Sequence, residues 1–317
     1  MMTSKWSSCF LLIPLLAGQL SAADVSAAAA PGQTQSMPAG AKALRDLAYV
    51  ENGHERQRLD LYLPANTEGS FPLIIWVHGG AWKGGSKDRC PAARFVSQGY
   101  AVASVNYRLS QHAVFPAQIQ DCKAAVRWLR AHAKEYRLDP DRFAAWGSSA
   151  GGHLVALLGV TGDTKEFDIG PNLDYSSRVQ AVVDYFGPTD LTRMAAQSGP
   201  DSAMNHDAPN SPESELIGGP VTDNPEKALK ASPITYVSKN DPPFLLVHGD
   251  KDPLVPWQQS QMLNEALKKA GVESELQIVK GAGHGNGFGQ PENQKVTEFL
   301  RKHLAPGPAG GSRIPRP

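Results

Sequence analysis

The chain has 317 residues, 41% of them hydrophobic, and its formal net charge is +0. This length and composition suit one large globular domain or two smaller ones, and the balanced charge argues against nucleic acid as a partner. No apolar segment reaches the roughly 18–20 residues that a helix needs to cross a bilayer, so we expect no stable membrane insertion.

The N-terminal residues have the pattern of a secretory signal peptide. Lys5 supplies the positive charge, residues 9–17 are mainly apolar, and Ser21 and Ala23 place small side chains at the −3 and −1 positions of a cleavage site. Cleavage after Ala23 predicts that residues 1–23 are the signal peptide of a secreted or periplasmic protein. A short membrane anchor is the alternative, which the brevity of the apolar segment disfavours.

Low-complexity segments bound the predicted folded part. Residues 24–43 are rich in Ala, Pro, Gly, Gln and Ser and are expected to form a disordered linker, and residues 305–317 a disordered tail. The catalytic domain is therefore predicted to cover residues 44–304, a length acceptable for a single α/β domain.

Within that range, strand-like and helix-like segments alternate. Apolar and alternating runs predict strands over residues 47–50, 58–64, 72–77, 100–107, 142–146, 179–186, 243–248 and 275–279. Helices are predicted over residues 91–98, 116–136, 154–158, 256–270 and 293–304. The first two strands suit an antiparallel hairpin. The remainder predicts an α/β fold with a mostly parallel central sheet and helices on both faces.

Residues 189–232 interrupt this alternation. The segment is rich in Pro, Ser, Asn, Asp and Gly, and it is too long for an ordinary connection. Segments of this kind are usually lids or binding loops, so we expect a lid-like insertion here. A disordered surface insertion is the alternative.

The motif Gly147-x-Ser149-x-Gly151 marks a candidate nucleophile. It follows a short apolar strand and precedes an apolar helix, which is the context of a nucleophile elbow. Glycines are needed there because the strand and the helix approach closely on either side of the serine. Ser149 is therefore the predicted nucleophile.

A serine hydroxyl needs a base, and the chain offers 9 histidines. His284 lies in a glycine-rich loop directly after the last predicted strand, at the sheet edge where sites form in α/β folds. We therefore predict His284 as the base. His153 is the rival, but one helical turn after Ser149 it would point along the helix. His78 and His248 end buried strands and are expected to be hydrogen-bonded core residues.

The acid is expected between the serine and the histidine, because this fold class runs Ser, Asp or Glu, His. Asp250 and Asp252 both follow a buried strand. Asp252 is the predicted acid, since it lies later in the turn and the proline at 253 would fix the loop. Asp250 is the first alternative, and Asp184 and Asp190 are others.

Backbone N–H donors are needed for the oxyanion that forms during acyl transfer. Gly79 and Gly80 follow the first buried strand, and Ala150 begins the helix after the elbow. These three residues are the predicted oxyanion hole.

Aromatic residues near the predicted strand ends are candidates for the substrate pocket. Trp82, Tyr107 and Tyr185 are expected to shape the acyl and alcohol sites together with residues 189–232. Each of them, taken alone, is more often a core or surface residue than a substrate contact.

Together these motifs resemble the α/β-hydrolases. His-Gly-Gly-Ala-Trp at 78–82 and Gly-Ser-Ser-Ala-Gly-Gly at 147–152 resemble esterases related to hormone-sensitive lipase, although Ala81 stands where that branch usually has a third glycine. With residues 115–123 and 248–256, the chain is more closely similar to secreted bacterial carbohydrate-ester hydrolases, which include bifunctional feruloyl and acetylxylan esterases.

The resemblance implies a secreted serine carboxylesterase. It would cleave acetyl or feruloyl esters of plant polysaccharide, or similar short-chain esters, through an acyl-enzyme. A prolyl-peptidase-type serine peptidase is one alternative, but such enzymes usually carry a large gating domain for which residues 44–304 leave no room. A non-catalytic binding protein on a hydrolase scaffold is another, which would be expected to lose a triad residue.

No cofactor and no metal are expected. Residues 80–87 lack the Gly-Lys-Ser/Thr of a phosphate-binding loop, and residues 281–289 lack the spacing of a dinucleotide site. The chain also has no His-Glu-x-x-His motif and no paired Cys-x-x-Cys motif.

Two cysteines remain once Cys9 leaves with the signal peptide. Cys90 and Cys122 would form an even pair in an oxidising compartment, so we expect a disulfide between them. Two reduced, buried cysteines are the alternative.

Overall fold

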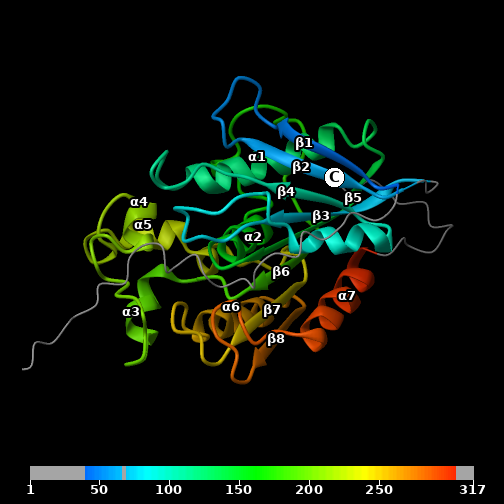
Figure 1. Ribbon diagram of the computed structural model, residues 1–317. Helices are drawn as coiled ribbons and strands as arrows, with labels where there is room; N and C mark the ends of the chain where they lie inside the picture. Colours follow the sequence, from blue (N-terminus) through cyan, green and yellow to red (C-terminus); the bar gives the residue numbers. More distant parts are fainter. Residues whose placement is uncertain (1–39, 66–68, 305–317) are drawn as a thin grey trace, which may run out of the picture.

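The structure, a computed structural model, describes residues 40–65 and 69–304 (Figure 1). The predicted signal peptide, the predicted linker up to residue 39 and the predicted C-terminal tail lie outside the described residues. Within the described ranges, no helix combines the length and the apolar character that crossing a membrane would require.

Eight strands form one mixed sheet. They are β1 (Lys42–Ala48), β2 (Arg58–Leu63), β3 (Phe71–Val77), β4 (Ala101–Val105), β5 (Leu138–Ser148), β6 (Ala181–Tyr185), β7 (Phe244–Gly249) and β8 (Ser274–Val279). Across the sheet their order is β1-β2-β4-β3-β5-β6-β7-β8. Strand β2 is antiparallel to β1 and β4, and the other neighbouring pairs are parallel. This confirms the predicted sheet.

The sequence predicted the central strands because helices cover both faces of these strands. Strands β4, β6 and β7 are buried along their whole length, which requires continuous apolar runs. The edge strand β1 is mostly exposed and has a bulge between Leu44 and Leu47, with Asp46 at φ 55°. Its apolar alternation is therefore broken. The prediction found only its end, and placed Lys42 in the linker.

Helices cover both faces of the sheet (Figure 1). The 3-10 helix η2 (Pro91–Gln98) and α7 (Gln290–Leu304) pack on one face. Helices α1 (Ala117–Ala131), α2 (Ala150–Val160) and α6 (Gln258–Lys269) pack on the other. Each face has its own cluster of buried apolar side chains, so the sheet separates two cores.

The expected disulfide is wrong: Cys90 and Cys122 are both free cysteines. Cys90 precedes η2 and packs with the cluster on that face, whereas Cys122 lies on α1 within the opposite cluster. The sheet stands between them, and a disulfide spans only about 4.4–6.8 Å between Cα atoms. Burial raises the pKa of the Cys90 thiol to about 12, so it remains a protonated thiol at neutral pH.

Residues 189–232 contain short helices instead of the irregular loop that their composition indicated. These are η4 (Leu191–Arg193), α3 (Met194–Gln197), α4 (Pro212–Ile217), η5 (Val221–Asp223) and α5 (Pro225–Ala231). Proline at the first helical position begins both α4 and α5. Figure 1 shows α3, α4 and α5 grouped to one side of the sheet. Two further 3-10 turns are η3 (Lys165–Phe167) and η6 (Pro233–Tyr236).

Candidate active site

Ser149 occupies a strained turn between β5 and α2. Its φ of 56° and ψ of −124° lie where residues with side chains rarely occur. A Cβ on Gly147 would lie 2.3 Å from the carbonyl oxygen of Gly151, and one on Gly151 would lie 2.1 Å from that of Val77. The glycines of the motif are therefore required by the close approach of helix α2 to the sheet.

The structure brings the predicted nucleophile, base and acid into one hydrogen-bonded chain. Ser149 Oγ lies 2.9 Å from His284 Nε2, and His284 Nδ1 lies 2.7 Å from Asp252 Oδ2. Since a carboxylate only accepts, Nδ1 of His284 carries the proton, which leaves Nε2 free to accept the serine hydroxyl. This is the arrangement that activates a serine as a nucleophile.

Asp252 is buried but well supplied with donors. Its Oδ1 accepts the backbone N–H of Leu254 at 2.8 Å and that of Val255 at 2.9 Å, and its Oδ2 faces His284 and His248. Burial acts to raise the pKa of this carboxyl, but the hydrogen bonds from the two histidines outweigh it and hold the pKa below its usual range. Asp252 is therefore ionised at neutral pH.

The rival histidine, His153, has a structural environment. Its Nδ1 accepts the indole N–H of Trp82 at 3.2 Å, so its Nε2 donates to the carbonyl of Ala231 at 2.7 Å. Burial lowers the pKa of His153 to about 4, which keeps the ring neutral. The histidine thus joins α2 to α5 and to the loop after β3.

The alternative carboxylates also have other partners. Asp250 Oδ1 accepts the backbone N–H of Gly281 at 2.7 Å, which ties the loop after β7 to the histidine loop. Asp190 caps η4 by accepting the N–H of Thr192 at 3.1 Å. Asp184 is buried within β6, and burial raises its pKa to about 7. Of the four predicted candidates, Asp252 is the one that contacts His284.

The glycine-rich loop after β3 lies directly against the elbow. A Cβ on Gly79 would lie 2.7 Å from the Ser148 carbonyl oxygen and 3.2 Å from Ser149 Cβ. Gly80 has a φ of 113°, and its carbonyl accepts the N–H groups of Lys83 and Gly84, both at 2.9 Å. Ala150 begins α2, where N–H groups have no acceptor within the helix. Gly79 and Ala150, two of the three predicted oxyanion donors, therefore lie beside Ser149, and Gly80 lies in the turn that follows Gly79.

Arg56 supports this loop and was missed by the sequence analysis. Its guanidinium donates to the carbonyls of Tyr107 and Gly85 at 2.8 and 3.0 Å, and it lies 3.2 Å from His78 Nε2. Burial lowers the pKa of His78 to about 4, so the neutral ring can donate from Nδ1 to the Gly79 carbonyl at 2.7 Å. No local motif marks Arg56, because its partners lie in other segments.

The three aromatic residues expected in the substrate pocket are buried below the surface. Trp82 and Tyr107 are 2% and 0% exposed, and their polar atoms donate to His153 and to the His78 carbonyl. Tyr185 is 8% exposed and packs in the cluster on the η2 face. The expectation of substrate contact is therefore corrected, because other segments cover these rings.

Residues 202–217, which we call the strap, run from the loop after β7 that holds Asp252 (the acid loop) to the glycine-rich loop after β3 (the oxyanion loop). At one end the backbone N–H of Ala203 donates to the Pro253 carbonyl at 2.9 Å. At the other end Lys83 Nζ lies 2.8 Å from the Glu215 carboxylate. The strap is thus attached to both of these loops.

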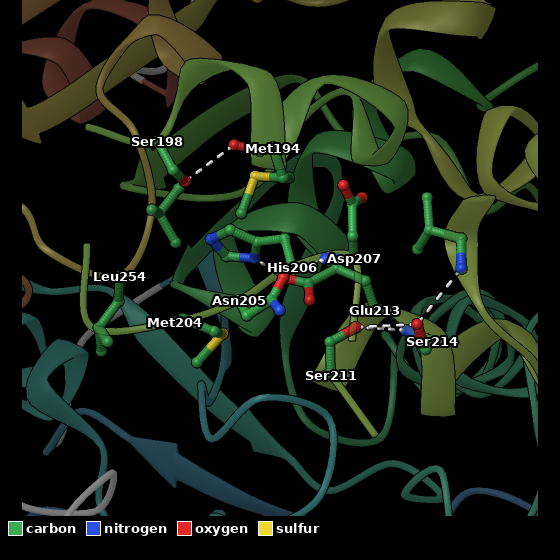
Figure 2. A network of polar contacts seen from close by, with 12 residues as sticks. Met194, Ser198, Met204, Asn205, His206, Asp207, Ser211, Glu213, Ser214 and Leu254 are labelled. Carbon is green, nitrogen blue, oxygen red and sulfur yellow. Dashed lines mark hydrogen bonds and ion pairs between the residues drawn. The ribbon is translucent and has the colours of Figure 1, made fainter. Parts of the chain in front are cut away.

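A buried polar pair lies inside the strap (Figure 2). His206 Nδ1 and Glu213 Oε1 are 3.1 Å apart, and both side chains are buried. Ser211 Oγ accepts the N–H of Ser214 at 3.1 Å, which caps α4. The remaining polar atoms of the pair, His206 Nε2 and Glu213 Oε2, have no partner within the described ranges.

One group of side chains in the described ranges has the composition of a metal site. Potential ligand atoms of His54, Glu55 and His112 lie within 4.8 Å of one another. However, Nδ1 of His54 accepts the N–H of Arg56 at 3.1 Å, and Nδ1 of His112 accepts that of Leu109 at 3.2 Å. A histidine bound to a metal through Nε2 donates from Nδ1. The arrangement therefore fits hydrogen-bonded loops and does not fit a metal centre.

Comparison with known proteins finds esterases. The profile of the BD-FAE family matches residues 59–267. The chain is 34% identical over 247 residues to the probable carboxylic ester hydrolase LipM of Mycobacterium tuberculosis, covering 75% of this chain and 55% of LipM. It is 35% identical over 234 residues to the esterase LipQ of the same organism, covering 72% and 53%. The chain thus spans about half the length of these curated relatives.

Solved structures of esterases have the same fold. A truncated carbohydrate esterase from gut microbiota superposes with a TM-score of 0.76 at 35% identity, covering 83% of this chain and 96% of that one. The esterase Est2 of Thermogutta terrifontis superposes with a TM-score of 0.65 at 28% identity, covering 87% and 96%. The overall fold of this chain is therefore shared with solved structures that are described as esterases.

Proposed function

The chain belongs to the BD-FAE family and has the α/β-hydrolase fold, and from this premise we propose that it is a serine carboxylesterase. The observation that best supports this proposal is the hydrogen-bonded chain from Ser149 through His284 to Asp252. In this proposal the three residues act as nucleophile, base and acid, and the backbone N–H groups of Gly79, Gly80 and Ala150 bind the oxyanion.

Acylation begins when His284 Nε2 takes the hydroxyl proton of Ser149. The Oγ atom attacks the ester carbonyl carbon, and the carbonyl electrons move to its oxygen, which the backbone N–H donors stabilise. The carbonyl re-forms as the bond to the alcohol oxygen breaks, and His284 gives its proton to that oxygen. The ionised Asp252 stabilises the imidazolium while it lasts.

Deacylation repeats these steps with water. His284 takes a proton from the water molecule, whose oxygen attacks the acyl carbon and forms a second oxyanion at the same donors. Collapse of this intermediate breaks the bond to Ser149 Oγ, which recovers its proton from His284. The free acid then leaves, and the site returns to its starting state.

We propose acetyl, feruloyl or similar short-chain esters of plant polysaccharide as the substrates. We also propose that the predicted signal peptide directs export of the protein. Two findings support the proposed substrates. The gut carbohydrate esterase and a bifunctional GH43-CE protein of Bacteroides eggerthii are both similar to this chain, at 35% and 36% identity. Structures of Est2 hold butyrate and propionate, which are short acyl groups.

Hydrolysis assays on wild type and Ser149→Ala test the proposal. We expect the variant to lose at least about 10⁴-fold in kcat on p-nitrophenyl acetate, because the nucleophile is gone. Wild type should release acetate from acetylxylan or ferulate from methyl ferulate, and should favour acetyl and butyryl over octanoyl esters. Ser97→Ala, which changes an exposed serine on η2, is the control.

Two outcomes would contradict the proposal at different levels. Wild-type turnover by Ser149→Ala would exclude the mechanism. A preference for octanoyl esters, with no release from acetylxylan or methyl ferulate, would exclude the substrate class and leave the mechanism intact. Labelling with a fluorophosphonate probe is an independent test of the mechanism, because only an activated serine reacts with it.

A further inference from the structure

His248 is a buried ionisable residue that the proposed mechanism does not use. It lies near the end of β7, and its side chain is fully buried. Its Nε2 is 2.9 Å from the Val255 carbonyl oxygen and 3.3 Å from Asp252 Oδ2. His284 Nδ1 contacts the same carboxylate oxygen at 2.7 Å. Two imidazoles therefore meet on one oxygen of the predicted acid.

The surroundings of His248 determine where its ring proton lies. Two acceptors face Nε2, so this nitrogen carries the proton and donates toward them. On the opposite side, Nδ1 lies 2.7 Å from the hydroxyl oxygen of Ser260 on α6. A neutral ring accepts the Ser260 proton at Nδ1, which fixes the tautomer that presents an N–H to Asp252.

We propose that His248 is a positioning residue for the catalytic carboxylate, and that Ser260 acts through it by fixing its tautomer. A continuous series of polar contacts then runs from α6 through β7 to the acid loop, the base and the nucleophile. The inference rests on the proposed function, because it has meaning only if Asp252 orients His284.

The contacts of Asp252 explain why a second imidazole matters. Two backbone N–H groups hold Oδ1, whereas Oδ2 faces only imidazole nitrogens among the contacts of the described residues. His248 and His284 are also the ionisable groups that act on this carboxyl. Without His248, the charge on Oδ2 would be balanced by His284 alone, which would strengthen the attraction between the carboxylate and a protonated His284 and leave the carboxylate less firmly oriented.

Steady-state hydrolysis of p-nitrophenyl acetate by the full chain, followed against pH, tests this role. We expect His248→Leu to lower kcat by about tenfold or more with little change in KM, because a misplaced base costs transition-state stabilisation. The acid limb of kcat/KM should move to higher pH. His248→Gln can place an amide N–H near the position of Nε2, so it should recover much of the loss.

Ser260→Ala provides a milder test that leaves every contact of Asp252 in place. It should lower kcat less than His248→Leu and shift the pH profile in the same direction. Ser274→Ala is the matched control. Ser274 is also a buried serine, and its hydroxyl donates to Asn264 on α6 at 2.9 Å. It pairs with Phe244 at the start of β7, whereas the acid loop follows the end of that strand. We expect wild-type kinetics from this control.

The proposal is overturned if folded His248→Leu and Ser260→Ala keep the wild-type kcat and pH profile, or if Gln restores no more activity than Leu. Should His248→Leu not fold, the Ser260→Ala profile decides alone. Failure of the serine mechanism gives a different result, namely turnover by Ser149→Ala, so the two ideas are tested separately.

Discussion

Two buried aspartates beside the elbow have opposite electrostatic environments. Both oxygens of Asp252 face N–H donors, and its pKa stays below its usual range because hydrogen bonds from His248 and His284 outweigh burial. Asp184 accepts one hydrogen bond, from the Gly187 N–H at 2.9 Å, and within the described part of the chain its Oδ2 has no partner. Burial raises its pKa to about 7. This contrast suits Asp252, and not Asp184, to a constant negative charge beside His284.

The raised pKa of Asp184 predicts a pH-dependent loss of stability. An unfolded aspartate ionises near pH ~4, whereas the folded one keeps its proton to about pH 7. Between these values the folded state binds the extra proton, so the contribution of this group to stability falls as the pH rises. Asp184→Asn cannot titrate. We therefore expect the free energy of unfolding of Asp184→Asn minus that of wild type, measured by urea titration, to increase from pH 5 to pH 8. A constant difference would show that Asp184 is ionised in the fold.

Among single residues, the sequence best predicted those candidate catalytic residues whose position is fixed by a turn directly after a strand. Ser149, Asp252 and His284 each lie in a turn directly after a predicted strand, and parallel strands bring such turns to one edge. Arg56 and the contact of His248 with the acid were not predictable, because their partners are distant in sequence. Trp82 was misassigned for the same reason, since His153 of α2 packs against it only in the folded chain.

The strap is the element whose structure the sequence revealed least. Its helix α4 has six residues, Pro212–Ile217, too few to show a helical period. Its attachments, through Ala203 to Pro253 and through Glu215 to Lys83, join segments far apart in the chain. The composition identified residues 189–232 as a long insertion. It did not indicate that these residues form short helices, or that the strap within them contains a buried polar pair.

The two acidic residues of the strap are expected to differ strongly in their effect on stability. Glu213→Ala leaves the Nδ1 atom of buried His206 without its partner, which should cost about 2–4 kcal/mol of unfolding free energy. Glu215→Ala removes a partly exposed ion pair with Lys83, which should cost no more than about 1 kcal/mol. Urea unfolding of both variants makes the comparison. Equal losses would show that the buried pair contributes nothing beyond a surface contact.

For the whole molecule, the alternation of segments was enough to predict the sheet and its two helical layers. It did not tell which helix covers which face, because that depends on the path of each crossover. The error over Cys90 and Cys122 has this origin: Cys90 precedes η2 and Cys122 lies in the second turn of α1, and these two helices pack on opposite faces. The bulged edge strand β1 was also mostly missed, since an exposed strand has no buried face to give it a pattern.

Because Cys90 and Cys122 form no disulfide, we expect folding of the catalytic domain not to depend on the proposed export to an oxidising compartment. The whole sheet, both cores and the Ser149 site lie within residues 40–304, and they are held without a disulfide. Protein produced in a reducing cytoplasm without residues 1–23 should therefore match the kcat/KM of the exported protein. Signal-peptide cleavage after Ala23 predicts that the exported form begins at Asp24, which N-terminal sequencing and intact mass would check. An exported protein that retains Met1 would contradict the signal peptide, and an inactive cytoplasmic form with normal exported activity would show that folding depends on the oxidising compartment.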